Sequence, residues 1–217
     1  MTTKNFYLKM IVTIISLNMF LSCSNNPGGT LIEAPNLVLP PETQTGANTF
    51  GCLINGKLLV PRDGLGSFSG SGSKGVIIWG DVTGNQQYNE IDVHDYKSAR
   101  TANILLHIQN LHQLGVGQYI VNLSNGMTSI DGLNHTYIHC RIFNETLNMY
   151  QYYRSFDNSG SIKITRYDSP NQIIQNRIFS GTFSGKLKNS VNASDIIEIT
   201  DGRFDFNKRT ILDQIFL

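Results

Sequence analysis

The chain has 217 residues, and its 17 Lys and Arg residues nearly balance its 16 Asp and Glu residues, so the formal charge is +1. This balance excludes the strongly basic class of nucleic-acid binders and gives no indication of any other polyanion partner. The composition is 40% hydrophobic and 10% aromatic with 20 Gly and 6 Pro, which is typical of a folded, β-leaning protein rather than a disordered or collagen-like one. The length is sufficient for one domain with a real core.

The first 22 residues are organised as a secretory signal peptide. Lys4 and Lys9 precede an apolar run from Met10 to Leu21, and the small residue Ser22 then precedes Cys23. The apolar run has 12 residues, whereas a membrane-spanning helix needs about 20. We therefore expect the segment before Cys23 to be removed, rather than kept as a transmembrane anchor.

The four residues Phe20 to Cys23 resemble a bacterial lipobox, although an aliphatic residue is more usual where Phe20 stands. The resemblance implies that Cys23 is acylated, as by palmitate, and becomes the first residue of the mature chain. Ser24, rather than Asp, follows the cysteine, and the sorting rules for such lipoproteins then imply the outer membrane. The stretch from Ser24 to Gly29 lacks the acidic cluster associated with surface export. We therefore expect the protein to face the periplasm, with the cell surface as the alternative.

Residues 23–48 are predicted to be the lipidated cysteine followed by a flexible tether. They are polar and contain four of the six prolines, Pro27, Pro35, Pro40 and Pro41. A coil of this length reaches about 25–30 Å, enough to lift a domain clear of the lipid headgroups. The apolar pieces Leu31-Ile32 and Leu37–Leu39 offer an alternative, because they could dock on the domain as an edge strand.

Residues 49–217 are predicted to form a single all-β domain. Short β-prone runs alternate with turn residues, and no stretch of helical length shows a 3.6-residue period. The clearest hairpin joins Phe50–Ile54 to Lys57–Val60 through Asn55-Gly56, which readily forms a type I′ turn. The remaining strands are expected at Val76–Gly80, Tyr88–His94, Thr101–Gln109, Gln118–Asn122, Thr136–Phe143, Met149–Arg154, Ser161–Tyr167, Ile173–Phe183 and Asp195–Phe206.

About eleven such strands predict an antiparallel β-sandwich, with a closed or half-closed β-barrel as the alternative. Three segments, Thr43–Lys57, Gly181–Phe183 and Ile197–Asp205, also resemble an uncharacterised family of Bacteroidota lipoproteins of unknown function. The resemblance covers the chain from about Thr43 to the C-terminus. It supports the location in the envelope, and it brings no catalytic residues and no reaction with it.

Glu90, Asp92 and His94 form the first candidate site. They alternate with apolar residues, so in a strand all three share one face at intervals of about 6.5–7 Å. These side chains are potential metal ligands, and His107 or Gln109 on the next strand could complete the site. The alternative is that they form the solvated, charged face of an amphipathic strand.

The cysteines could take part in a zinc site or in a disulfide. His139 and Cys140 are adjacent in a predicted strand and point to opposite faces, which argues against a zinc site that uses both. Cys52 and Cys140 are both expected to face the core. With Cys23 acylated, they form the one pair that could make a disulfide in an oxidising compartment. Two free core thiols are the alternative, and we favour it narrowly.

The densest aromatic cluster lies at Tyr150, Tyr152, Tyr153 and Phe156, beside Arg154. At a strand end and turn these side chains could stack on sugars or contact a protein, although tyrosine is also an ordinary strand residue. We take Tyr150, Tyr152, Tyr153 and Arg154 as a candidate binding set.

The glycine-rich run Gly64–Gly75 contains the residue pattern of a nucleotide-binding motif, but it leads into a predicted strand rather than a helix. It is therefore interpreted as a hairpin loop. No catalytic residues and no cofactor are indicated by any motif in the chain. The sequence therefore predicts an envelope-anchored, non-enzymatic β module that binds a protein or glycan partner. The alternative is a metal-dependent or carboxylate hydrolase.

Overall fold

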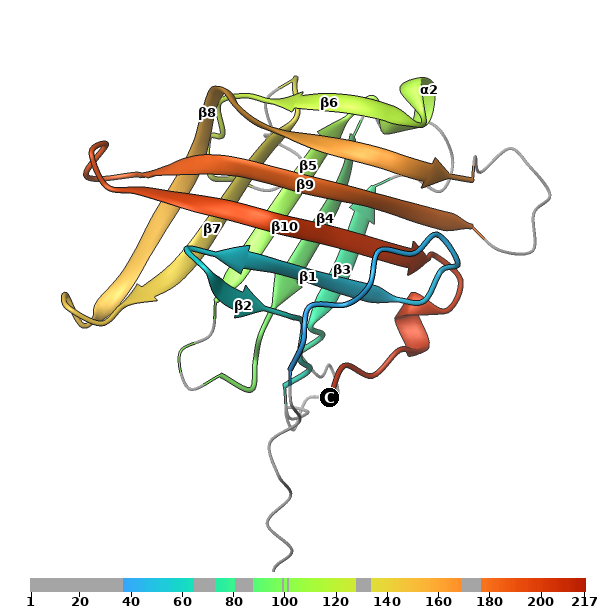
Figure 1. Cartoon of the computed structure of the whole chain (residues 1–217), viewed down its shortest axis with the longest axis horizontal. Coiled ribbons are helices and arrows are strands. Elements are labelled where there is room, and N and C mark those ends of the chain that lie inside the picture. The colour runs from blue at the N-terminus through green and yellow to red at the C-terminus, as the bar shows by residue number, and fades with distance from the viewer. Residues whose placement is uncertain are drawn as a thin grey trace, which may run out of the picture. The chain divides into compact units, whose positions relative to one another are not determined.

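The computed structural model describes residues 37–64, 73–80, 88–98, 100, 102–127, 134–168 and 177–217. Within these residues, ten strands form one antiparallel sheet in the order β2-β1-β10-β9-β8-β7-β5-β4-β3, with β6 paired to β8. The sheet coils into a half-barrel in which β1, β2, β9 and β10 form one layer and β3, β4, β5 and β7 cross behind it (Figure 1). The predicted all-β fold is confirmed, and its form is the half-closed barrel that was the alternative to the expected sandwich.

The strands lie close to the positions expected from the sequence. Their bounds are β1 (Thr49–Ile54), β2 (Lys57–Leu59), β3 (Val76–Gly80), β4 (Tyr88–His94), β5 (Asn103–Gln109), β6 (Gly117–Val121), β7 (Tyr137–Asn144), β8 (Met149–Tyr167), β9 (Ile178–Asn189) and β10 (Ile196–Asn207). Helical structure in the described residues is limited to the four-residue helix α2 (Leu111–Leu114) and the 3-10 turn η2 (Ile211–Asp213). No helix among these residues is long and apolar enough to cross a membrane.

Strand β8 has 19 residues and belongs to both layers of the half-barrel. Its first part pairs with β7 and its last part with β6, and a break in its register with β9 lies between Ser155 and Gly160. Gly160 leaves no room for a Cβ atom, because the backbone of Ser184 and Gly185 lies against it. The expectation of two strands separated by a turn near Phe156 was therefore wrong: the chain bends through a bulge without leaving the sheet.

The hydrophobic core lies between the two layers and is built from alternate residues of each strand. Cys52 and Cys140 are both part of it, and both are free thiols. Burial raises the pKa of Cys52 to about 12 and raises the pKa of Cys140 still further. These thiols therefore stay protonated and behave as small apolar core residues.

The segment before β1 is anchored to the domain by the carboxylate of Asp205, whose residue is only 1% exposed. This carboxylate accepts hydrogen bonds of 2.6–3.1 Å from Thr43 Oγ1, Ser180 Oγ and the backbone N–H groups of Thr45, Gly46 and Ala47. Burial alone would raise the pKa of Asp205, but the hydrogen bonds outweigh it and hold the pKa at about 2.

The compact unit accordingly begins at Leu37 and not at the predicted boundary of Thr49. The later part of the predicted tether thus belongs to the domain, because hydrogen bonds to β10 hold it there. The predicted signal peptide, Cys23 and the tether as far as Asn36 lie outside the described residues.

A short segment after β2 closes one end of the half-barrel. The backbone N–H of Arg62 donates to the carbonyl of His94, and the N–H of Tyr96 donates to the carbonyl of Arg62, at 3.1 and 3.0 Å. These two bonds connect the layer that contains β2 to the end of β4. Asp63, the next residue, exchanges hydrogen bonds with the backbone of Phe216 near the C-terminus. The closed end therefore has a fixed backbone, on which a binding site can be built.

Candidate functional site

A cleft of about 300 Å³ lies where the ends of several strands meet. Its walls come from the β1–β2 hairpin, from the connection between β4 and β5, and from the end of β7 with the turn that follows. The lining residues are Ile54, Asn55, Lys57, Leu58, Leu59, Asp95, Ser98, Arg100, Ala102, Ile142, Phe143 and Glu145. Apolar side chains thus form much of the cleft, and charged or polar groups from three segments complete it. This is the usual composition of a small-ligand site.

The hairpin wall is held rigidly by its turn. Asn55 and Gly56 both have positive φ, 48° and 74°, as the predicted type I′ turn requires. The backbone N–H of Asn55 donates to the carbonyl of Glu198, and Asn55 Oδ1 accepts from the N–H of Glu198, both at 2.8 Å. The turn is therefore fixed to β10, which positions Lys57 and Leu58 at the cleft.

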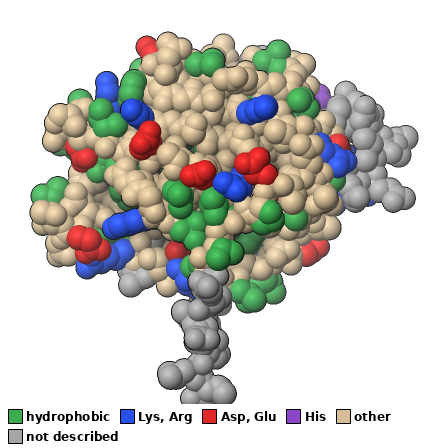
Figure 2. All heavy atoms as spheres, in the orientation of Figure 1, with side chains coloured by type: hydrophobic (Ala, Val, Ile, Leu, Met, Phe, Trp, Pro, Cys, Tyr) green, Lys and Arg blue, Asp and Glu red, His purple; other side chains and the backbone are tan. Residues whose placement is uncertain are grey.

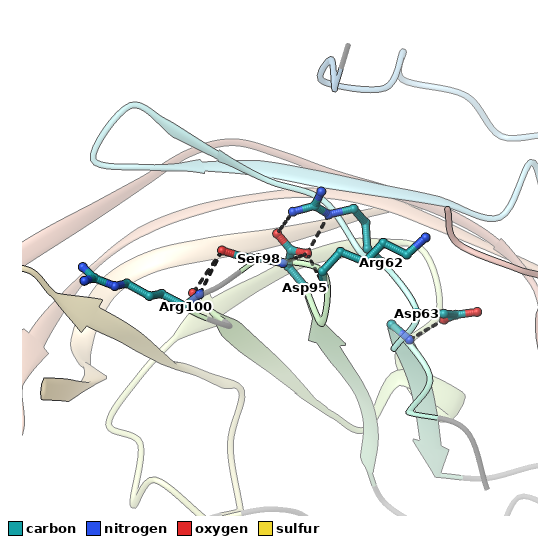
Figure 3. Close-up of polar contacts among 7 residues, drawn as sticks. Arg62, Asp63, Asp95, Ser98 and Arg100 are labelled. Atoms are coloured by element: carbon teal, nitrogen blue, oxygen red, sulfur yellow. Dashed lines mark hydrogen bonds and ion pairs between the residues drawn. The ribbon is translucent and has the colours of Figure 1, made fainter. Parts of the chain in front are cut away.

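The opposite wall of the cleft is organised by Asp95. No sequence motif had indicated a role for this residue. The guanidinium of Arg62 makes a two-pronged ion pair with this carboxylate, at 2.6 and 2.7 Å (Figure 3). Oxygen Oδ1 of Asp95 also accepts from the backbone N–H groups of Lys97 and Ser98. The aspartate side chain is 13% exposed and that of Arg62 is 17% exposed, so the pair is largely shielded from water. It fixes the first turn of the β4–β5 connection.

The outer rim carries the more accessible charges. Arg100 forms an ion pair with Glu145, with side chains 42% and 64% exposed, and its guanidinium lies 4.1 Å from the centroid of the Phe143 ring. The rings of Phe143 and Tyr150 are nearly perpendicular, with their centroids 5.2 Å apart, and the guanidinium of Arg141 lies 4.2 Å from the Tyr150 centroid. Cationic and aromatic groups therefore alternate from the cleft onto the outer face of β7 and β8.

The cleft carries no net charge of its own. Lys57 and Arg100 balance Asp95 and Glu145 among its lining residues. On the face of the molecule shown in Figure 2, acidic and basic side chains are likewise interspersed, without a patch of one sign. The arrangement suits a ligand that is itself uncharged and rich in hydrogen-bonding groups, because the lining offers both donors and acceptors and no net charge.

The predicted tyrosine set is divided by the sheet into two faces. Tyr150, Tyr152 and Arg154 lie on the outer face of β8, where Tyr152 is 54% exposed. Tyr153 points inward, is 3% exposed and donates its hydroxyl proton to Asp195 Oδ2 at 2.8 Å. Tyr153 is therefore a core residue and does not belong with the surface residues. The expected turn at this point is a strand, so the three outer side chains extend the cleft as a flat surface rather than a loop.

The predicted metal ligands lie on one face of β4, but Glu90 pairs with His107, whereas Asp92 and His94 pair with each other. Glu90 is fully buried and its Oε1 lies 2.7 Å from His107 Nδ1, while His94 Nε2 lies 3.0 Å from Asp92 Oδ1. Across the described residues, no three His, Cys, Asp or Glu side chains converge in a way that could hold a metal ion. The metal site stays a prediction without support from this geometry. The alternative of a solvated face is wrong for Glu90, because this face is covered.

The covered face is organised around His107. Its ring stacks between Tyr88 and Tyr137, with centroid distances of 5.3 and 4.3 Å. Its Nε2 lies 3.2 Å from Gln109 Oε1, and the Gln109 amide donates to Asn134 Oδ1 at 2.7 Å. None of these polar groups lines the cleft, and the buried chain that they form acts as a specific packing element.

His139 was expected on the opposite face from Cys140, and it lies there. Its Nδ1 is 3.2 Å from Ser124 Oγ, and burial lowers its pKa to about 4. The imidazole is therefore neutral at neutral pH.

The glycine-rich run Gly64–Gly75 lies largely outside the described residues. The N–H of Gly64 donates to the carbonyl of Ser73 at 2.9 Å and so brings the two ends of the run together.

Asp95 and Arg100, which line the cleft, and Arg62, which pairs with Asp95, were not anticipated from the sequence. The spacing of Asp95 and Ser98 is a weak signal, since an aspartate that caps backbone N–H groups two and three residues later is typical of a tight turn. Arg62 and Arg100 carry no such local pattern.

The chain matches no family model, no curated protein and no solved structure. The geometry of the cleft is therefore the basis for a proposed function.

Proposed function

We propose that this protein is an envelope-anchored lipoprotein whose β domain binds a glycan in the end cleft and on the adjoining face of β7 and β8. The observation that carries the proposal is the cleft of about 300 Å³, with its apolar lining, its paired charges and its continuity with the Arg–aromatic row. Binding without catalysis is the proposed role.

A glycan fits this chemistry better than a protein surface does. The volume lies at the small end of the range for ligand pockets, which suits a short saccharide. Sugar rings present apolar C–H faces and a rim of hydroxyls, and the cleft offers apolar side chains beside Asn55, Ser98, Arg100 and Glu145. The exposed ring of Tyr152 gives a further stacking surface.

The hydrolase alternative has less support. The closest carboxylate–imidazole pair, Glu90 and His107, is 0–1% exposed and lies outside the lining of the cleft. Asp95 and Glu145, the two carboxylates of the cleft, are each engaged by an arginine. Hydrolysis by two carboxylates needs both of them within hydrogen-bonding distance of the substrate, and Asp95 is held in a shielded ion pair with Arg62, which leaves Glu145 as the one accessible carboxylate among the lining residues.

The test is a glycan microarray probed with the full-length protein in detergent, followed by calorimetric titration of the strongest hit. We expect saturable binding that Arg100→Ala weakens at least tenfold, about 1.4 kcal/mol. Lys186→Ala is the matched control, because Lys186 is exposed on β9 and does not line the cleft. Equal loss in both variants, or cleavage of the glycan during the titration, would contradict the proposal.

The proposed anchor is the lipid on Cys23, in the outer membrane and facing the periplasm. Metabolic labelling with an alkynyl fatty acid should mark the wild-type chain and leave Cys23→Ala unlabelled. Protease added to intact cells should leave the protein uncut, whereas cutting would place it on the cell surface. A retained Met1 in the intact mass would contradict the anchor itself.

A further inference from the structure

The outer face of β7, β8 and β9 beside the end cleft carries three cations. Arg141 lies on β7, opposite Tyr152 of β8, and Arg154 of β8 lies opposite Lys188 of β9. Lys188 Nζ lies 4.1 Å from the centroid of the Phe156 ring. The cations therefore occupy neighbouring strands on one side of the sheet, and we call this surface the cationic face.

Among the described residues, the cations of this face have no carboxylate partner. None of Arg141, Arg154 and Lys188 forms an ion pair with an Asp or Glu of that part of the chain. Nε of Arg141 is buried and has no hydrogen-bond partner there. Asp92 lies on the same side of the sheet two strands from β7, and its Oδ1 is 3.0 Å from His94 Nε2. The positive charge of the face is thus unpaired in the described structure.

Contacts other than ion pairs hold the two arginines in place. The guanidinium of Arg141 lies 4.2 Å from the centroid of the Tyr150 ring. Arg154 lies against the backbone at Gly126, where a Cβ atom would be only 2.7 Å from Arg154 Nε. An aromatic ring and a glycine backbone restrict these side chains without neutralising them. The face is therefore preorganised for an anion.

The position of this face favours an acidic saccharide as the source of the anion. Arg141 contacts the ring of Tyr150, which packs against Phe143, and Phe143 lines the end cleft. A glycan with one sugar in the cleft therefore continues over the cationic face. Tyr152, which is 54% exposed, offers the next sugar a stacking surface beside Arg154. Arginine binds carboxylate and sulfate groups through paired N–H donors.

We propose that the cationic face binds the anionic substituent, a carboxylate or a sulfate, of an acidic saccharide whose neutral part occupies the end cleft. Arg141 and Arg154 hold the anionic group, and Lys188 adds a further positive charge. This binding rests on the proposed glycan site in the cleft and narrows its ligands to acidic saccharides. The whole chain has a formal charge of only +1, so the preference comes from the local arrangement and not from bulk charge.

Affinity electrophoresis of the full-length protein in detergent tests this preference. The gels contain dextran, dextran sulfate or polygalacturonate, and retardation is measured against a gel without polysaccharide, which corrects for changes in protein charge. We expect binding of at least one acidic polymer to be at least tenfold tighter than binding of dextran. The two acidic polymers distinguish recognition of a sulfate from recognition of a carboxylate.

Arg141→Gln and Arg154→Gln should each weaken binding of the acidic polymer at least tenfold. Lys163→Gln is the matched control, because it removes one exposed positive charge from β8 beyond the bulge, and it should change binding less than twofold. Arg154 is exposed, so its variant is expected to fold even where loss of the partly buried Arg141 disturbs the sheet.

Equal retardation by dextran and the acidic polymers, retardation by neither acidic polymer, or an equal loss in Lys163→Gln would overturn the proposal. Binding of oligo-dT as tight as that of the acidic polymers would also overturn it, since the face would then recognise charge alone. Neutral glycans on the microarray and Arg100→Ala test the cleft separately. Neutral binding that Arg100→Ala weakens, together with no preference for acidic polymers, would leave the cleft proposal standing and overturn this one.

Discussion

The buried face of β4, β5 and β7 and the rim of the end cleft both pair a carboxylate with a cationic or basic group, in very different surroundings. Glu90 and His107 are 0% and 1% exposed, whereas Glu145 and Arg100 are 64% and 42% exposed. A buried polar pair must satisfy its hydrogen-bonding groups inside the protein, and losing one member is costly. An exposed pair contributes little to stability and stays available to a ligand.

The difference divides the polar residues of this protein into two groups. The sealed group, with Asp205 and His107 as its clearest members, specifies which segments pack together. The cleft group, with Arg100 as its clearest member, can change partners at little cost. Substitutions should therefore separate stability from binding.

The largest effect is expected for Asp205→Ala, which removes the acceptor that anchors the segment before β1. We expect a loss of about 4 kcal/mol in the free energy of unfolding, because several buried donors lose their partner together. Since hydrogen bonds hold its pKa at about 2, below the ordinary 3.8, this stabilisation is present above pH 4 and is lost as the pH falls toward 2.

Urea unfolding measures both parts of this expectation. Asp201→Asn is the matched control, because Asp201 lies on the same strand, has a 53% exposed side chain, and has a positive φ that asparagine tolerates. A loss below about 1 kcal/mol for Asp205→Ala would show that the anchor is not a stabilising contact.

His107→Ala should be next in size, at about 3 kcal/mol, because it leaves the buried Glu90 without its imidazole and opens a gap between Tyr88 and Tyr137. Chemical denaturation gives the stability, and calorimetry should show unchanged affinity for the glycan that binds the cleft. A large loss of glycan affinity in a folded His107→Ala protein would show that the buried face around His107 affects binding in the end cleft. It would contradict the separation of stability from binding.

A smaller, pH-dependent effect is expected for His139. Burial lowers its pKa to about 4, below the ordinary 6.5, so the unfolded chain takes up this proton before the folded one. Stability should therefore decline as the pH falls from 6.5 to 4, with a contribution on the order of 2 kcal/mol. His139→Gln should flatten the curve in this window, and an unchanged pH dependence would show that other groups control it.

Arg100→Ala should have the smallest effect on stability, within about 0.5 kcal/mol, because its ion pair with Glu145 is well exposed to water. Thermal unfolding of the purified variant tests this. A destabilisation of more than about 2 kcal/mol would place Arg100 in the sealed group. A loss of glycan binding by this variant could then result from unfolding.

The sequence was sufficient for most of the fold because strand periodicity and turn chemistry are local. Asn55-Gly56 predicted its hairpin correctly, and the alternation around Cys140 correctly placed this residue inward and His139 outward. The continuity of β8 through residues 155–160 was missed, since a bulge there depends on the backbone of β9 that approaches Gly160. Docking of Leu37–Leu39 was only the alternative to a flexible tether, and nothing in the sequence indicated the main anchor for this segment, because Asp205 lies on the last strand.

The candidate site was far less accessible from the sequence. Its residues come from three separate segments, and the partners of Asp95 and Glu145 are set by how the half-barrel coils. Alternation alone placed Glu90, Asp92 and His94 on one face, but it could not show that this face is covered. The composition shows how many charged side chains the chain has. Which of these side chains are exposed to water is known only from the fold.

The most direct test of the account is a chemical-shift map of the full-length protein in detergent, titrated with the glycan selected on the microarray. The perturbed resonances should belong to Asn55, Ser98, Arg100 and Phe143, while those of His107 and its stacked neighbours should not move. Perturbations centred on His107, or none near Arg100, would contradict it.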